Sequence, residues 1–510
     1  MSMHCGVVMN AAKTITDVLF TAVSAMTVAA LAVTSACSTH RSAAEEVSKA
    51  ITDWHRPSIL LDQGESGELP AVPSAERSVG VGITEEEEGH GRRSASPSPL
   101  QSYVRQALER NPSVRAASAD ARAKLERIAQ VTSLPDPVLR AIVRPEPIQT
   151  AAGDMYFTLG VGQTIPLPAK LEGAGRSAAA EVRMAIERLN AVRLGVIADV
   201  EQAYYRLYLT DRSIELTEAH RQLLEELEPV LASQYRAGGA EQQDLLRIQI
   251  EIAKLRDDEN RLGRRRASAA AALNQLLDYP PDRELAGTLP ISPRTFDADV
   301  EQLIALAAAH NPELATFTHR AQRDREEIAL ARLAHWPDAT IGFEWTYTEP
   351  RDPFIPPINP QTGIRPPYND RSDGGDDNWA LTLQLNLPIW LGRIEAAKRE
   401  ARQRLHETQH EKQAVLNKIA FRVYDAWVRV QTQQETIRLL ESTLIPQAKQ
   451  TYEVSLTSYQ AGKTDFLTVI DNWRRLLDFE LMLHREVADL EIAFSELQRQ
   501  VSVQLEEKRG

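Results

Sequence analysis

The histidines are the side chains of this sequence that most resemble metal ligands. His406 and His410 are four residues apart, so in a helix they share one face, a spacing that can bind a metal ion. Because no third ligand stands near them, a solvated helix face is the alternative that we favour. His310, His319 and His335 are scattered over other helical stretches. We therefore expect no metal site, no cofactor and no catalytic residues, and the protein is not expected to be an enzyme.

Charge and cysteine content exclude further classes of protein and of binding site. The chain has 510 residues, a formal net charge of -13 and 43% hydrophobic residues, which is typical of a globular protein. So acidic a chain lacks the basic surface that nucleic acid requires, and we expect no nucleic-acid partner. The two cysteines, Cys5 and Cys37, both lie near the N-terminus, which excludes a disulfide framework and a CxxC metal site.

Residues 1–36 are typical of a secretory signal peptide. Lys13 precedes an apolar run that begins at Val18 and ends in small residues. A membrane anchor is the alternative, since the run is nearly long enough to cross a bilayer. The stretch "TSAC", which ends at Cys37, resembles a bacterial lipoprotein processing site. Cys37 is then the first mature residue and a lipid anchor; simple cleavage nearby, leaving a free thiol, is the alternative.

Residues 37–97 follow with a different composition. They are rich in Pro, Ser and Gly, include a run of four glutamates, and show no sustained apolar period. Such a segment cannot bury enough apolar surface to offset the entropy of ordering. We predict a flexible linker between the lipid anchor and the folded body.

The remaining sequence contains one unit twice, over residues 98–290 and 298–507. The second copy carries an insertion, Pro350–Asp377, so the offset between matching positions grows from 200 to 222 residues. Because the markers keep the same order, duplication explains them better than coincidence. The matched pairs are Asn111 with Asn311, Pro166 with Pro388, and Gly238 with Gly462.

Each copy is expected to fold as helix, two strands, very long helix, turn and shorter helix. From Ile419 to Tyr459 the apolar residues recur at a mean step close to 3.6, so a long helix needs a coiled-coil-like partner. Pro229 and Pro446 should bend the two long helices, since each removes a backbone hydrogen bond. The glycine of each Tyr-x-Ala-Gly stretch suits the left-handed conformation that ends a helix. The chain then closes as two long helical hairpins whose strands meet at one end.

The predicted strands, at about 137–166 and 339–389, alternate apolar with polar residues. An ordinary hairpin covering a soluble core is the alternative, but each strand is about ten residues long, which spans a bilayer when tilted. Four strands cannot close a barrel in a membrane, so oligomerisation is required, and three copies supply twelve strands. We expect the polar face to line a water-filled lumen. Its members are Thr158, Thr164, Glu344, Thr346, Thr382, Gln384 and Asn386.

Residues 99 to 505 resemble the outer-membrane efflux protein (TolC-type) family. The resemblance rests on the duplicated Asn-Pro helix start, the strand ends "QTIPLPAKL" and "LNLPIW", and the two Tyr-x-Ala-Gly turns. It implies a mainly α protein with a membrane β-barrel: a homotrimer whose twelve-stranded outer-membrane barrel continues into a periplasmic α-helical tunnel. It also implies docking with a periplasmic membrane-fusion adaptor and an inner-membrane pump, and export of drugs, metal ions or proteins.

The resemblance places the two glycine turns at the periplasmic mouth. It implies a gate at Asp471 and Asp244, where three copies of Asp471 form a ring that disfavours anions. The alternative is that both aspartates suit the first turns of the returning helices, where the helix dipole favours negative charge. The implied adaptor-docking residues are Arg236, Gly238, Leu245, Leu246, Gly462, Val469 and Ile470.

Two other functions stay open at this point. A pore-less periplasmic coiled-coil scaffold lipoprotein would also consist of long helical hairpins, and would become soluble without its lipid. A channel for type I protein secretion would have the same elements as an efflux channel.

Overall fold

The computed structural model describes residues 41–54, 58–60, 99–150, 153–349, 356–367, 375 and 377–506. The predicted signal peptide, Cys37, much of the predicted linker and part of the Pro350–Asp377 insertion lie outside these residues. The described chain is mainly helical, as predicted.

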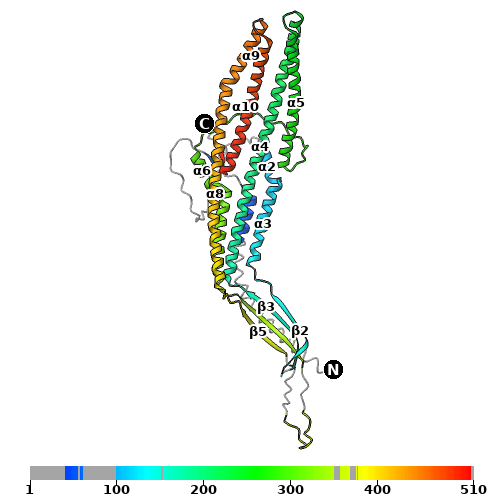
Figure 1. Cartoon of the computed structure of the whole chain (residues 1–510), viewed down its shortest axis with the longest axis vertical. Helices are drawn as coiled ribbons and strands as arrows, with labels where there is room; N and C mark the ends of the chain where they lie inside the picture. The colour runs from blue at the N-terminus through cyan, green and yellow to red at the C-terminus, as the bar shows by residue number, and fades with distance from the viewer. Residues whose placement is uncertain are drawn as a thin grey trace, which may run out of the picture. The chain divides into compact units, whose positions relative to one another are not determined.

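The elements follow the same order in the two halves of the chain (Figure 1). The first half contains α2 (Pro99–Arg110), α3 (Pro112–Thr132), β2 (Val138–Thr150), β3 (Gly153–Ile165), α4 (Pro168–Arg236) and α5 (Gln242–Leu276). The second contains α6 (Val300–His310), α7 (Pro312–Leu333), β4 (Ala339–Glu349), β5 (Asn378–Leu385), α8 (Leu391–Leu439), the π-helix η1 (Leu440–Leu444), α9 (Ile445–Gln460) and α10 (Phe466–Val501).

The chain divides into two compact units, which we describe separately. The strand unit consists of Met1–Asp53, Asp120–Ile186 and Phe317–Glu411, and the hairpin unit of Trp54–Ala119, Glu187–Thr316 and Lys412–Gly510. All four long strands belong to the strand unit, and both glycine turns belong to the hairpin unit.

The strand unit contains one antiparallel sheet in the order β2-β3-β4-β5. Residues paired across neighbouring strands of a sheet point to the same face, so the register defines two faces. Thr158 pairs with Thr346, and Gly342 pairs with Thr382, which places the predicted polar residues together. The sheet is not closed within the chain, because β2 and β5 form its two edges.

The opposite face of the sheet is apolar and exposed. Leu381 is 74% exposed, Leu383 68% and Trp379 63% on β5, and Leu139 on β2 is 74% exposed. Large apolar side chains at this exposure need a covering that the described part of the chain does not supply.

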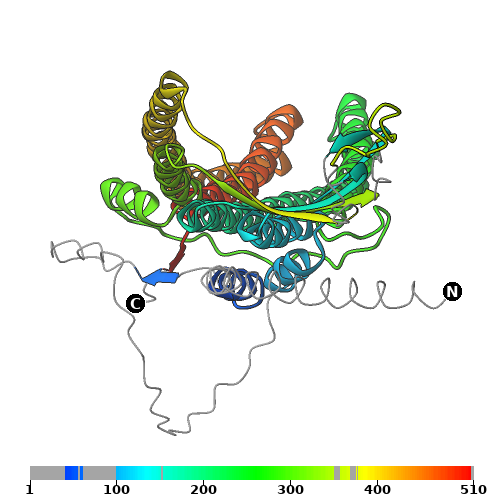
Figure 2. The ribbon, with the colours of Figure 1, turned by 90° about the horizontal axis from the view of Figure 1, so that it is seen from below.

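The helices of the strand unit pack around a small core that includes an N-terminal helix over residues 41–52 (Figure 2). Ala43 and Val47 of this helix pack with Ile128 of α3 and Val182 of α4. Arg183 donates a hydrogen bond to Glu46 at 3.1 Å. The predicted flexible linker therefore needs correction here: the apolar residues four apart bury one face of a short helix.

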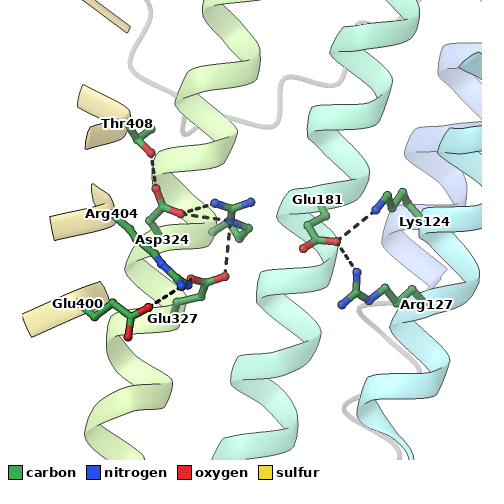
Figure 3. A network of polar contacts seen from close by, with 9 residues as sticks. Lys124, Arg127, Glu181, Asp324, Glu327, Glu400, Arg404 and Thr408 are labelled. Carbon is green, nitrogen blue, oxygen red and sulfur yellow. Dashed lines mark hydrogen bonds and ion pairs between the residues drawn. The ribbon is translucent and has the colours of Figure 1, made fainter. Parts of the chain in front are cut away.

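Charged side chains tie neighbouring helices of the strand unit together (Figure 3). Glu181 of α4 forms ion pairs with two side chains of α3, Arg127 at 3.1 Å and Lys124 at 3.8 Å. On α7, the fully buried Asp324 accepts hydrogen bonds from Arg323 and from Thr408 of α8. These contacts connect α3 with α4 and α7 with α8.

The hairpin unit has two apolar cores. In the first, Phe296 and Phe494 meet edge to face at 5.1 Å between ring centroids, and a nearby ion pair joins Arg294 to the buried Glu491 at 2.6 Å. The second, which we call the tip core, joins the hairpin α4/α5 to the hairpin α9/α10. Its buried members are Leu224, Leu231, Ile248, Ile252, Leu255, Tyr452, Phe466, Val469, Ile470, Trp473, Leu476 and Leu477.

The two prolines affect their helices differently. Before Pro446 the chain forms the π-helix η1, in which the N–H of Ile445 donates to the carbonyl of Leu440, five residues back. A π-bulge accommodates a residue that cannot donate, and the bend expected at Pro446 stays a prediction. At Pro229, α4 continues as a single helix of 69 residues.

A short parallel pair joins distant parts of the hairpin unit. β1 (Ser58–Leu60) pairs with β6 (Gln504–Glu506), drawn in blue and dark red in Figure 2. Leu505 is buried in the first apolar core, and its carbonyl accepts a hydrogen bond from Gln498. No pattern in the sequence indicated β1, because three residues are too few to show a period.

Candidate functional site: hairpin tips and polar sheet face

Both glycine turns end their helices in the same way. Gly238 has φ +76° and Gly462 has φ +70°, so the predicted left-handed conformation is confirmed at each. The N–H of Gly462 donates to Tyr459 and that of Lys463 to Ser458, both at 2.9 Å. The same two bonds recur around Gly238. This is the Schellman arrangement, which satisfies the last carbonyls of a helix.

Asp244 lies in the first turn of α5 and is buried. Burial raises its pKa above the ordinary value of 3.8, and the nearby carboxylates of Glu241 and Asp465 act in the same direction. Burial and then Asp244 raise the pKa of Tyr459 to about 12. The first-turn position agrees with the helix-dipole alternative. Burial, however, disfavours the charged form of the Asp244 carboxyl, a free-energy cost that an exposed aspartate at a helix start does not have.

Asp471 lies beyond the first turn of α10, where the helix-dipole alternative does not reach. Its side chain is 51% exposed and pairs with Arg474 at 3.1 Å. Arg474 also donates from Nε to Glu251 of α5 at 3.2 Å. Asp471 therefore stands at the surface, beside an arginine that links α10 to α5.

The residues expected to dock the adaptor at the tips differ in how exposed they are. Arg236, Gly238 and Gly462 are exposed, as is Leu246 at 51%, whereas Leu245 is partly buried. Val469 and Ile470 need correction, because they are only 1% and 2% exposed and pack in the tip core. The period of α10 turns them toward α5, so they support the tip from inside.

Several polar groups near the tips were not predicted from the sequence. Among the described residues, the hydroxyls of Tyr452 and Tyr459 and the indole N–H of Trp473 are buried without a hydrogen-bond partner. A groove between α9 and α10 is lined by uncharged side chains. Its lining includes Thr451, Val454, Ser455, Ser458, Thr468 and Asn472. Aromatic and hydroxyl residues inside a helical stripe look like ordinary core residues in a sequence, so no signal distinguished them.

The predicted lumen residues lie on the polar face of the sheet. Thr158 and Thr346 share a hydrogen bond at 3.0 Å, and Thr164 bonds Thr340 at 2.9 Å. Thr382 and Gln384 continue this face on β5. Asn386 lies just beyond β5, where its N–H donates to Asp338.

Two arginines on β2 join this face and were not predicted. Arg140 pairs with Glu344 at 3.7 Å, and Arg144 donates to the hydroxyl of Thr158 at 3.0 Å. The face therefore carries positive as well as negative charge. The stretch "PVLRAIVRP" could have indicated them, but its alternation of apolar and polar residues is weaker than that of the second strand pair.

No metal site forms among the described residues. No group of three or more His, Cys, Asp or Glu side chains comes together there, and both His406 and His410 are exposed. In the described part of the chain, no helix combines the length and apolar character needed to cross a membrane.

Known proteins resemble this chain in sequence and in fold. The model of the family described as "Outer membrane efflux protein" matches residues 103–278 and 303–500. The chain is 23% identical over 331 residues to two proteins of Pseudomonas putida strains, the probable efflux pump outer membrane protein SepC and the toluene efflux pump outer membrane protein TtgF. Each match covers 62% of this chain and 63% of the relative, less than two thirds of its length.

Solved structures extend the similarity in fold. The outer membrane protein VceC of Vibrio cholerae matches with a TM-score of 0.63 at 19% identity, over 80% of this chain and 97% of that one. At this identity the match concerns the fold alone.

Proposed function

The chain belongs to the outer membrane efflux protein family, and from this premise we propose that it is the outer-membrane channel of a tripartite export system. It is a transport protein and not an enzyme, and it lies in the outer membrane with a periplasmic extension. In the proposed system it receives substrate from an inner-membrane pump through a periplasmic adaptor and releases it outside.

The sheet of the strand unit is the observation that carries the proposal. One face is apolar and exposed, with Leu381 and Leu383 as its most exposed members on β5, and the other face is lined by threonines and charged residues. Lipid is the environment that suits the first face, and water suits the second. The edges β2 and β5 must pair with other strands in lipid, because unpaired backbone groups there are costly. Three copies would pair these edges in a twelve-stranded barrel.

A fractionation experiment separates the channel from the pore-less scaffold. A Cys37→Ser variant that is still exported lacks the proposed lipid anchor. We expect it to remain in the outer-membrane fraction, to need detergent for extraction, and to run as a trimer in native mass spectrometry. A soluble periplasmic chain would favour the scaffold and contradict the channel.

We further propose that Asp471 forms the periplasmic gate, with Asp244 behind it. Asp471 is exposed and lies in the second turn after the glycine turn, so symmetry copies would present a ring of carboxylates. Asp244 is buried at the start of α5, so it would not itself meet the permeating ion.

Conductance in planar bilayers tests the gate. Asp471→Ala should raise single-channel conductance or weaken block by divalent cations, because the ring loses its charge. Asp478→Ala is the matched control, since it removes one exposed aspartate from the same helix two turns further on. Equal behaviour of both variants and the unchanged protein would contradict the gate while leaving the channel intact.

A further inference from the structure

Two arginines of β2 belong to the polar face of the sheet. Arg140 pairs with Gly160 of β3, which pairs with Glu344 of β4, so these residues form one row across the sheet. Arg144 lies four residues further along β2, which places it on the same face as Arg140. Its hydrogen bond to Thr158 of that face agrees with this placement. Each copy thus presents two guanidinium groups on its polar face, and their surroundings differ.

The charge of Arg140 is compensated within the sheet. Its guanidinium lies 3.7 Å from the carboxylate of Glu344, although β3 runs between the two strands. Gly160 makes this contact possible, because a Cβ there would lie 3.0 Å from the Cγ of Glu344. A glycine inside a strand often marks such a close approach. Arg140 and Glu344 therefore form a pair of opposite charges over bare backbone, which adds no net charge to this face.

Arg144 has a neutral partner instead. Its guanidinium donates to the hydroxyl of Thr158, which in turn shares a hydrogen bond with Thr346. Thr158 pairs with Ile142, two residues before Arg144, so the guanidinium reaches back along β2. The hydroxyl holds the guanidinium against the sheet but does not cancel its charge, and arginine stays protonated in proteins. Arg144 therefore gives the polar face a positive charge that its hydrogen-bond partner leaves uncompensated.

The acidic residues at the far ends of the strands lie away from this guanidinium. Glu146 lies two residues beyond Arg144, in the irregular part of β2 and in the direction opposite to Thr158. Asp154 and Glu349 pair with each other at the ends of β3 and β4. Glu349 is two residues from Tyr347 of the apolar face, so the register places both acids on that face.

A neighbouring copy would not supply an acidic partner from its edge strand. In the proposed barrel, β5 of that copy would lie beside β2, and β5 contains no acidic residue. Asp377 comes just before β5, where its carboxylate accepts a hydrogen bond from the N–H of Thr348 at 3.3 Å. This contact directs Asp377 toward β4, on the opposite side of β5 from the edge that would meet β2.

We infer that Arg144 makes the strand-lined lumen of the proposed channel select anions, and that it binds substrates through a carboxylate or phosphate group. The inference rests on the proposed trimer, in which three copies of Arg144 form a ring of positive charge. Arginine suits this role, because its planar guanidinium can donate two parallel hydrogen bonds to such a group. The ring is opposite in sign to the Asp471 ring proposed at the periplasmic mouth, so the two rings need separate tests.

Reversal potentials under a gradient of KCl test the selectivity. All channels in this comparison carry Asp471→Ala, so that the acidic ring does not determine the result. Arg144→Gln should shift the reversal potential toward the potassium equilibrium potential, because the lumen loses its positive ring. The matched control is Arg140→Gln with Glu344→Gln, which removes an arginine of the same strand and face together with its acidic partner. Since the net charge of the face is unchanged, the control should keep the reversal potential.

Inorganic phosphate tests the binding of an oxyanion. Phosphate added to the KCl solution should reduce the single-channel current reversibly, and Arg144→Gln should lose most of this block. Arg144→Lys keeps the charge but loses the planar pair of donors. It should therefore keep the reversal potential and be blocked more weakly by phosphate. Heat-resistant trimers on gels check that each variant assembles.

The outcomes separate this inference from the proposed function. Conducting channels in which Arg144→Gln changes neither the reversal potential nor the phosphate block would overturn the inference and leave the proposed function standing. An equal shift in the Arg140 and Glu344 control would overturn the assignment to Arg144. If Arg144→Gln does not assemble, undiminished phosphate block in Arg144→Lys would overturn the binding of an oxyanion. Trimers without conductance steps in the unchanged protein would overturn the proposed function itself.

Discussion

At the scale of single residues, the two turn glycines are needed for conformation and not for space. Gly238 and Gly462 have positive φ, and a Cβ added at either would meet nothing within 4 Å. Replacing either with alanine should cost about 1–2 kcal/mol, because the left-handed conformation brings Cβ close to the following carbonyl oxygen. Thermal unfolding in detergent and hydrogen exchange at Lys463 measure the loss.

Gly263 provides the control for this prediction. It lies inside α5, also with open space around it, but without positive φ. Gly263→Ala should stabilise the helix by roughly 0.5–1 kcal/mol. Destabilisation of similar size at all three glycines would show that the turn conformation is not the cause.

The burial of Asp244 predicts a pH dependence with a definite sign. Its pKa is raised above 3.8 in the folded chain, so the folded state favours the protonated carboxyl. The stabilising effect of the proton is complete below the ordinary pKa and is lost as pH rises through the raised one. Relative to Asp244→Asn, the unchanged protein should therefore lose stability from about pH 4 toward neutral pH, as measured by the difference in Tm. A difference that is flat with pH, or that grows in the opposite direction, would contradict the buried-carboxyl account.

At the scale of elements, the strands and turns could be predicted from local pattern. The alternation in "TIGFEWTYTEP" set both the strand and its two faces, because a strand has a side-chain period of two. It was harder to predict which neighbour the apolar face of a helix packs against. Val469 and Ile470 looked like surface residues of a tip, but the packing of α10 on α5 turns them inward. A stripe on one helix does not say which neighbour it meets.

Adjacent residues on β5 test the two faces of the sheet. Leu383 is 68% exposed on the apolar face, and Gln384 is its neighbour on the polar face. Leu383→Arg should cost about 2–4 kcal/mol if the face meets the middle of a bilayer, and the chain should fail to assemble in the outer membrane. Gln384→Arg should assemble normally and shift ion selectivity toward anions. Heat-resistant trimers on gels and reversal potentials in bilayers read out the two effects, and equal assembly of both variants would argue against a lipid-facing surface.

At the scale of the whole molecule, the sequence predicted the mainly helical composition and the order of elements in each half. It did not predict the helix over residues 41–52 or the pairing of β1 with β6. Both depend on contacts between segments far apart in the chain, such as Val47 with Val182, and a local pattern carries no information about such contacts.

Single-channel recording of the purified, full-length protein in planar bilayers tests the central claim most directly. We expect discrete, reproducible conductance steps from a preparation that native mass spectrometry shows to be trimeric, and a larger or less readily blocked step with Asp471→Ala. Trimers that insert into the bilayer but give no conductance steps, in the unchanged protein and in Asp471→Ala alike, would show that this chain does not form an outer-membrane channel.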